Sequence, residues 1–302
     1  FPGACVAPLA VTVNGCPRPS VPVSFGLTSW RSLSTESTDV DGPLSELRTG
    51  DWLDAQSFPP LSYAVPGIVP EGLTLLVGPP KVGKSWLTSG LCLGLADGGR
   101  VLGAIDVTEP RPVLLLALED GHRRLQSRAR RLMAGQSIPA GFTYVTRIPR
   151  GSSVPELVDA WCAKYGSDGL VVIDTLGKIM PPALPGESAY ARDYRVAGSI
   201  KRLADDRPGL AVLVVHHDRK AGGEDFVDSV SGTHGIAGAA DTIVVLGRPR
   251  ATGDGMLRVT GRDVVERDYA VRLVDGVAWE LVGDSLDAAA TSAAAIRATV
   301  GL

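Results

Sequence analysis

The sequence predicts an α/β fold with a mainly parallel central β-sheet flanked by helices. Two observations lead to this prediction. Several short runs are apolar on both faces, as strands inside a parallel sheet are, and they alternate with helical patterns. Acidic residues recur where these runs end, and the carboxyl ends of parallel strands are where such sheets place their ligand sites.

The amino-terminal segment 1–45 is rich in Pro, Gly, Ser and Thr, which predicts irregular structure, and a short helix is expected within residues 43–54. From residue 73 the pattern changes to alternating elements. Buried strands are predicted at 73–77, 113–120, 142–146, 169–176 and 210–217, and helices at 84–98, 122–135, 154–166 and 189–205. Residues 46–282 are therefore expected to form one domain.

Three later segments, 239–248, 255–263 and 269–281, predict strands at a carboxyl-terminal β-hairpin edge. The tail 283–302 is Ala-rich and helix-prone, and its abrupt end suggests that a further small domain is missing. The four cysteines form no CxxC pair. Cys92 and Cys162 are expected in the core, and Cys5 and Cys16 would pair only in an oxidising compartment.

Composition limits the partners of this 302-residue chain. The net charge is −3, so any contact with nucleic acid must be local rather than the product of a basic surface. No apolar stretch approaches the ~20 residues of a membrane span, and residues 1–20 lack the basic start of a signal peptide. A cytoplasmic protein with no membrane partner is the expectation.

The stretch GPPKVGKS, residues 78–85, follows an apolar strand and precedes a helix. This is the complete phosphate-loop pattern, in which glycines let backbone N–H groups surround a phosphate at a helix amino terminus. Lys84 is expected to reach the β- and γ-phosphates of ATP, and Ser85 to bind Mg²⁺. The residues predicted to contact the nucleotide are Gly78, Pro79, Pro80, Lys81, Val82, Gly83, Lys84, Ser85 and Trp86.

Two strand-end carboxylates are candidates for catalysis. Asp174 ends the run GLVVID, where a carboxylate that binds Mg²⁺ with Ser85 is expected. Glu119 ends LLLALED, where a glutamate could orient and deprotonate the attacking water. Asp120 is the alternative base, although an amino-terminal cap for the helix from His122 is the simpler interpretation of that residue.

The order of phosphate loop, strand-end Glu and strand-end Asp resembles the RecA-like P-loop ATPases. VPGIVPEGLTLLVGPPKVGKS, VLLLALED, VVIDTL and VVHHDRKAG…SGTHGIAGAADTIVVL together resemble the hexameric replicative helicases of broad-host-range plasmids and their phage and bacterial relatives, the AAA_25-like family. The similarity covers about residues 48–282. It implies a RecA-like fold, ATP and Mg²⁺ as cofactors, single-stranded DNA as partner, and a homo-oligomer in the form of a hexameric ring.

The same resemblance assigns roles to residues after the fourth strand. A side chain at the end of that strand would sense the γ-phosphate. Of His216 and His217, strand alternation points one toward the nucleotide, and His217 is nearer the strand end. Arg262 is expected to reach a neighbouring subunit's γ-phosphate, with Arg248 and Arg250 as competing candidates.

Two segments are expected to line the channel of such a ring, 177–195 after Asp174 and 218–236 after the histidines. Both are Gly-bearing and modestly basic, which suits backbone contact with single-stranded DNA. Because their aromatic residues are few, stacking is expected to be weak; these residues are Tyr190, Tyr194 and Phe226. The basic helix 122–135 is expected to present a solvated face.

Three functions fit these residues. The first is an ATP-driven ring motor, a replicative or accessory DNA helicase. The second is an ATP-dependent DNA-binding or recombination-mediator protein, which would hydrolyse ATP without unwinding DNA. The third is a small-molecule kinase, which would need arginines for the acceptor phosphate and against which the position of Glu119 argues.

Overall fold

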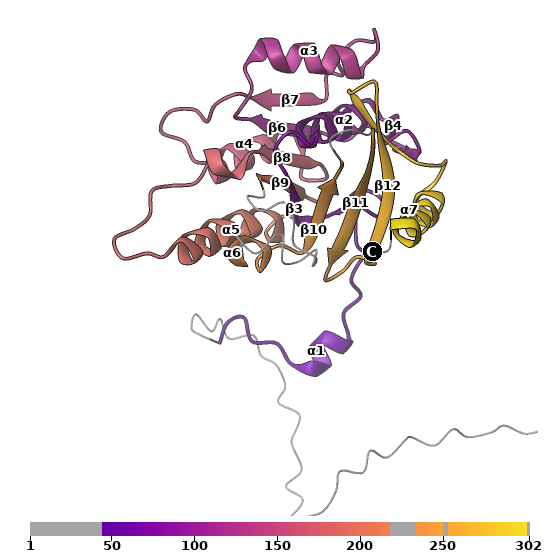
Figure 1. Cartoon of the computed structure of the whole chain (residues 1–302). Coiled ribbons are helices and arrows are strands. Elements are labelled where there is room, and N and C mark those ends of the chain that lie inside the picture. The colour runs from indigo at the N-terminus through magenta and orange to yellow at the C-terminus, as the bar shows by residue number, and fades with distance from the viewer. Residues whose placement is uncertain (1–43, 218–233, 250–252, 301–302) are drawn as a thin grey trace, which may run out of the picture. The chain divides into compact units, whose positions relative to one another are not determined.

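The computed structural model describes residues 44–217, 234–249 and 253–300 (Figure 1). Most of the irregular segment 1–45, with Cys5 and Cys16, and also Phe226 and Arg250, lie outside these residues. The chain divides into two compact units, residues 1–58 and 59–302. In the first unit, the expected short helix is confirmed as α1 (Gly50–Asp54), and the Thr49 side chain accepts a hydrogen bond from the Trp52 N–H at its start.

A large sheet organises the second unit. Within the described residues it has nine strands, in the order β13-β12-β11-β10-β3-β9-β8-β6-β7. The six strands from β10 to β7 pair in parallel, and the other three join in antiparallel fashion. The strands are β3 (Gly72–Gly78), β6 (Val113–Ala117), β7 (Phe142–Val145), β8 (Leu170–Asp174), β9 (Ala211–His217), β10 (Thr242–Gly247), β11 (Asp254–Gly261), β12 (Arg267–Val274) and β13 (Ala278–Leu281).

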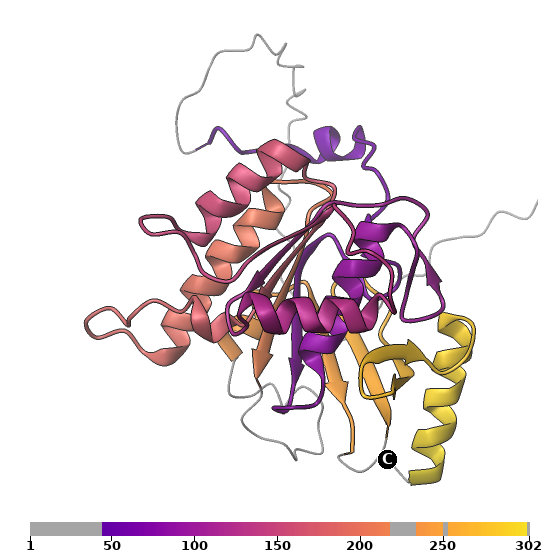
Figure 2. The ribbon, with the colours of Figure 1, turned by 90° about the horizontal axis from the view of Figure 1, so that it is seen from above.

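Helices cover both faces of the sheet, as Figure 2 shows from above. One core lies under α2, α3 and α7, and the other under α4, α5 and α6. The helical elements are α2 (Lys84–Asp97), α3 (His122–Leu132), α4 (Val154–Tyr165), η1 (Leu176–Lys178), α5 (Ala189–Asp205), α6 (His234–Ala237) and α7 (Leu286–Val300). The predicted α/β architecture is confirmed.

Strand alternation explains why the central strands are mostly apolar. In β3, Leu75 packs into the core under α5 whereas its neighbour Leu76 packs into the core under α2. Val171 and Val172 divide between the same two cores in β8. A strand with helices on both sides therefore needs apolar residues at successive positions, which is the pattern that predicted it.

The predicted carboxyl-terminal β-hairpin edge is confirmed. Within the predicted strand segment 269–281 the chain reverses at Asp275 and Gly276, with φ of 53° and 67°. These left-handed values suit an Asp-Gly hairpin turn, so β12 and β13 form a further antiparallel pair. In the tail, α7 packs against this edge with Ala289 and Ala293 fully buried.

Four short strands were not predicted: β1 (Tyr63–Val65), β2 (Val69–Pro70), β4 (Arg100–Val101) and β5 (Ile105–Asp106). They form two small antiparallel sheets, β1 with β2 and β4 with β5. Cys92 is buried as expected, Cys162 is half-buried, and both are free thiols. Among the described helices, none has both the length and the apolar character needed to cross a bilayer.

Candidate nucleotide-binding site

The phosphate-loop stretch forms a glycine cradle between β3 and α2. Gly83 precedes α2 with φ of 114°, a conformation that glycine adopts readily. A Cβ added to Gly83 would lie 2.9 Å from the Trp279 Nε1 atom, and one added to Gly78 would lie 2.5 Å from the Leu246 carbonyl oxygen. The Trp279 indole also donates a hydrogen bond of 3.1 Å to the Gly83 carbonyl. Strands β10 and β13 therefore support a loop in which only glycine fits at these positions.

Lys84 points into this cradle. The residue is 4% exposed, and its ammonium donates hydrogen bonds to the carbonyl oxygens of Gly78 at 2.6 Å and Pro79 at 3.0 Å. A buried ammonium is costly unless anions or dipoles surround it. Together with the amino terminus of α2, this arrangement fits an anionic ligand such as a phosphate.

Ser85 and Asp174 meet at the adjacent position, although they are far apart in the sequence. The Ser85 hydroxyl donates a hydrogen bond to the Asp174 carboxylate. Burial raises the pKa of Asp174; the Ser85 hydrogen bond opposes this shift, whereas the nearby Glu119 and Asp120 charges add to it. The hydroxyl oxygen of Ser85 and the buried carboxylate of Asp174 are oxygen ligands of the kind that Mg²⁺ prefers.

No cluster of three or more His, Cys, Asp or Glu side chains suited to a metal ion occurs in the part of the chain that the structure describes. A Mg²⁺ ion at Ser85 and Asp174 would therefore take its remaining ligands from phosphate oxygens and water, which is the usual arrangement for this ion in nucleotide sites.

Glu119 lies in the turn after β6, facing the ends of two neighbouring strands. The Leu118 N–H donates to the Asp174 carbonyl at 2.8 Å, which fixes the turn beside β8. The Thr175 hydroxyl donates to Glu119 Oε1 at 3.1 Å, and His217 Nε2 lies 3.8 Å from Glu119 Oε2. The structure therefore brings Glu119, Asp174 and His217 together at the carboxyl edge of β6, β8 and β9.

His217 is the member of the histidine pair that lies next to Glu119. It is in register with Gly78, the first residue of the phosphate loop, whereas His216 is in register with Val77. His217 Nδ1 is buried and has no hydrogen-bond partner among the described residues. The ring thus lies between the phosphate loop and the carboxylate.

Asp120 does not cap α3, so that interpretation is wrong. Gly121 occupies the cap position without a side-chain hydrogen bond, and the Asp120 carboxylate instead pairs with Arg128 and, at 3.3 Å, with Arg124. The Arg128 and Arg131 guanidinium groups lie 5.4 Å and 5.1 Å from the centre of the Trp86 ring. These contacts tie the start of α2 to α3 and fix the backbone next to Glu119.

A cavity of about 640 Å³ opens between these groups. Glu119 and Trp86 line it, and the rest of its wall comes from Gly121, Arg123, Arg124, Ser127, Arg128 and Arg131. Most of this wall comes from the exposed face of α3, so the solvated basic face that was expected also lines this cavity. Arginines beside Glu119 are also the feature that a kinase would need for an acceptor phosphate.

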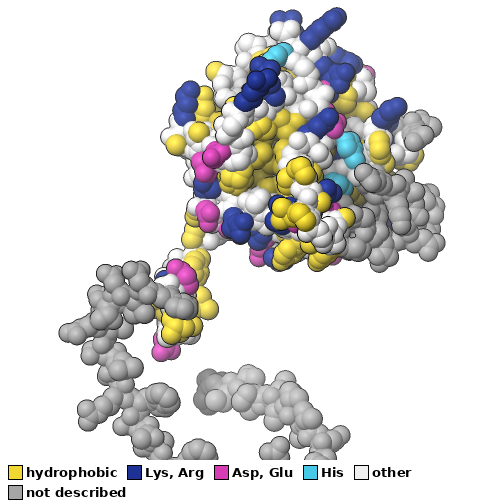
Figure 3. Space-filling view, turned by 90° about the vertical axis from the view of Figure 1, so that its left-hand side faces the viewer, with side chains coloured by type: hydrophobic (Ala, Val, Ile, Leu, Met, Phe, Trp, Pro, Cys, Tyr) yellow, Lys and Arg dark blue, Asp and Glu magenta, His cyan; other side chains and the backbone are white. Residues whose placement is uncertain are grey.

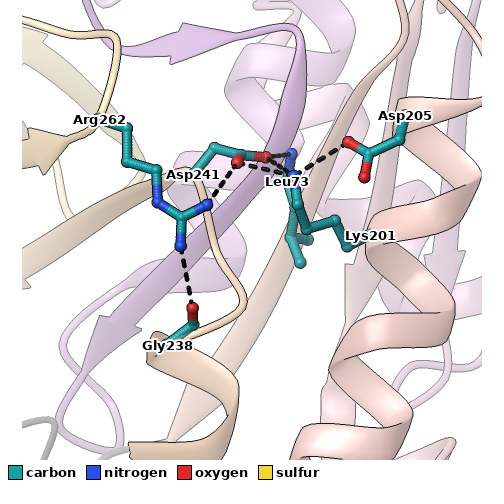
Figure 4. A network of polar contacts seen from close by, with 6 residues as sticks. All are labelled: Leu73, Lys201, Asp205, Gly238, Asp241 and Arg262. Atoms are coloured by element: carbon teal, nitrogen blue, oxygen red, sulfur yellow. Dashed lines mark hydrogen bonds and ion pairs between the residues drawn. The ribbon is translucent and has the colours of Figure 1, made fainter. Parts of the chain in front are cut away.

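The two arginine candidates within the described residues, Arg248 and Arg262, lie in different places. Arg248 lies at the phosphate loop, where its Nε donates to the Val82 carbonyl at 3.4 Å. Arg262 lies near the amino end of β3, where it contacts the Gly238 carbonyl at 3.2 Å and Asp241 at 3.7 Å (Figure 4). Asp241 also accepts a hydrogen bond of 3.0 Å from the Leu73 N–H. From Leu73 to Gly78, β3 extends roughly 17 Å at ~3.3 Å per residue, so Arg262 is remote from its own phosphate loop.

A family model described as an AAA domain, AAA_25, matches residues 43–223, more than half of the chain. The chain belongs to this family. No curated protein matches it in sequence. Among solved structures, the isolated ATPase domain of a phage protein aligns with a TM-score of 0.54 and 12% identity, over 70% of this chain and 85% of that chain.

A DnaB-like replicative helicase aligns with a TM-score of 0.52 and 13% identity, over 68% of this chain and 55% of that chain. The AAA_25 chain therefore matches about half the length of that helicase. At these identities the likeness shows the fold, which is RecA-like as the sequence predicted. Family and fold together support an NTPase.

Some residues at the site were not predicted from the sequence. Thr175 directly follows Asp174, so its place beside Glu119 could have been inferred from the strand ends. Trp279 carries no local signal, because it reaches the site only through the packing of the distant strand β13 against the loop.

Proposed function

We propose that this AAA_25 chain is a Mg²⁺-dependent ATPase whose hydrolysis drives a RecA-like ring motor on single-stranded DNA, a replicative or accessory DNA helicase. The observation that carries the ATPase assignment is the convergence of the buried Lys84, the Ser85–Asp174 pair and Glu119 at one edge of the sheet.

In this proposal each group has the role that its position at the sheet edge favours. The loop N–H groups and Lys84 bind the phosphates of ATP, and Ser85 and Asp174 hold the metal. Bound Mg²⁺ neutralises charge on the phosphates. Glu119 accepts the proton of the attacking water, with its carboxylate oriented by Thr175. His217, beside Glu119, responds to the γ-phosphate.

The DNA part of the proposal is supported by the family and by the RecA-like fold. The proposed partners are single-stranded DNA and further copies of the chain in a hexameric ring, and the proposed location is the cytoplasm. A local rather than global basic surface fits the net charge of −3. Figure 3 likewise shows basic and hydrophobic side chains intermixed on the face that it presents.

The test is phosphate release from ATP with and without single-stranded DNA, followed by strand separation on a forked duplex. A motor is expected to be stimulated by DNA and to separate the strands. Stimulation without separation would favour the mediator, and transfer of the phosphate to a small acceptor would favour the kinase. Hydrolysis that is indifferent to DNA would contradict the DNA part of the proposal.

Arg262 is proposed to act on the site of a neighbouring subunit, because its own phosphate loop is too distant. We expect Arg262→Ala to bind ATP nearly normally and to lose turnover by on the order of 10³-fold, as when a positioned cation is removed. Mixing it with Lys84→Ala should restore some hydrolysis, since one subunit can then supply Arg262 to an intact loop. If no ratio exceeds the sum of the separate proteins, the role in trans is wrong, and Arg248 or Arg250 becomes the candidate.

A further inference from the structure

Two tyrosines at the start of α5 form an exposed aromatic pair. The rings of Tyr190 and Tyr194 stack with centroids 6.2 Å apart and planes inclined by 14°. The two residues are 57% and 54% exposed, so much of each ring remains open to solvent. The spacing of four residues places both on one face of the helix.

The pair lies at the same edge of the sheet as the candidate site. Strand β8 ends there at Asp174, and α5 begins after the connection that follows, so its first turn is at the carboxyl edge. The Ser188 side chain caps this end by accepting a hydrogen bond from the Ala191 N–H.

Helix α6, which begins at His234 near the end of the segment 218–236, packs against the backbone of the pair. A Cβ added to Gly235 would lie 2.8 Å from the Tyr190 carbonyl oxygen and 3.0 Å from the Tyr194 nitrogen. Figure 1 shows α6 alongside α5. The described end of the segment 218–236, from His234 on, therefore packs against the backbone that carries these tyrosines.

The charge around the pair is modest. The Arg195 guanidinium donates two hydrogen bonds to Glu187, at 2.8 Å and 2.9 Å, and Arg192 lies 3.8 Å from Asp193. Much of the positive charge on this turn is therefore matched by carboxylates. A ligand that binds here would gain more from ring contact than from ion pairing.

We propose that Tyr190 and Tyr194 form a stacking platform for the bases of single-stranded DNA. This inference rests on the proposed function. A nucleic-acid base can stack on near-parallel exposed rings such as these. Because every base has a flat aromatic face, the contact does not depend on the DNA sequence. Because the rings themselves carry no charge, alanine substitution should weaken binding without much change in its dependence on salt.

The experiment measures binding of a labelled oligo(dT) strand to the full chain, with Mg²⁺ and a slowly hydrolysed ATP analogue, at two salt concentrations. The double variant Tyr190→Ala/Tyr194→Ala is expected to bind about tenfold more weakly at both, the usual scale for losing a stacked base. The double variant Tyr190→Phe/Tyr194→Phe keeps the rings and should bind like the wild type. A strand with abasic sites should lose affinity for the wild type but not for the Ala variant.

The matched control is Tyr165→Ala, which removes a 43% exposed tyrosine from the end of α4 and should leave DNA affinity unchanged. Thermal melting checks that each variant is folded. If the folded Ala double variant bound oligo(dT) as tightly as the wild type, the platform would be overturned. The same holds if this variant changed only its oligomer mass and not its DNA affinity. A wild type that hydrolyses ATP but binds no oligo(dT) would overturn both the platform and the DNA part of the proposed function.

Discussion

Replacing Lys84 by alanine is expected to lower the rate of ATP hydrolysis by on the order of 10²-fold or more, which is the usual loss when a positioned charge is removed from a reacting site. The ammonium is buried, and its recorded contacts include the loop carbonyls of Gly78 and Pro79. Alanine leaves the backbone path intact while removing the charge that would face the phosphates. Phosphate release under saturating ATP is the measurement.

The control for this substitution is Lys164→Ala, which removes a lysine from the last turn of α4 and should not alter turnover. Melting curves establish that both variants are folded. A folded Lys84→Ala protein that retained normal turnover would refute the assignment of the loop as a nucleotide site.

Glu119→Gln is expected to bind ATP normally and to hydrolyse it on the order of 10²- to 10⁴-fold more slowly, because the amide keeps the shape of the side chain but cannot accept the proton. The amide oxygen can still accept the hydrogen bond of the Thr175 hydroxyl, so the local packing should persist. Measuring analogue binding and single-turnover hydrolysis on the same protein separates the two effects.

The matched variant is Asp120→Asn at the neighbouring acid. Its carboxylate already pairs with Arg124 and Arg128, so the change should weaken the link to α3 and have the smaller effect on turnover. If Asp120→Asn abolished ATP hydrolysis while Glu119→Gln left it unchanged, Asp120 rather than Glu119 would be the base.

Much of the fold could be predicted because the central strands are short apolar runs between helical patterns. β3 and β8 have helices on both sides, so most of their successive residues are apolar. The strands β1, β2, β4 and β5 have only two or three residues, too few to show any period. The hairpin at Asp275 and Gly276 does carry its usual dipeptide signal, but that signal stands inside a longer apolar stretch that resembles one strand.

The phosphate loop and the strand-end carboxylates could also be predicted from the sequence. The loop is formed by consecutive residues, and the ends of parallel strands lie at the same edge of the sheet. The contact between Ser85 and Asp174 follows from that topology. The position of Arg262 does not. It depends on β11 running antiparallel to β10, which carries the end of β11 away from the phosphate loop. By contrast, the pairing of Asp120 with Arg124 is a local contact between residues four apart, which the sequence could have indicated.

The most direct test of the central claim is a calorimetric titration of the wild-type chain with a slowly hydrolysed ATP analogue, in Mg²⁺ and again in EDTA, with Asp174→Asn alongside. The account predicts saturable binding by the wild type that weakens when Mg²⁺ is removed. It also predicts that Asp174→Asn loses most of this dependence on Mg²⁺, because the buried carboxylate beside Ser85 is gone. A folded wild-type chain that showed no saturable binding in Mg²⁺ would contradict the assignment of this edge as a nucleotide site.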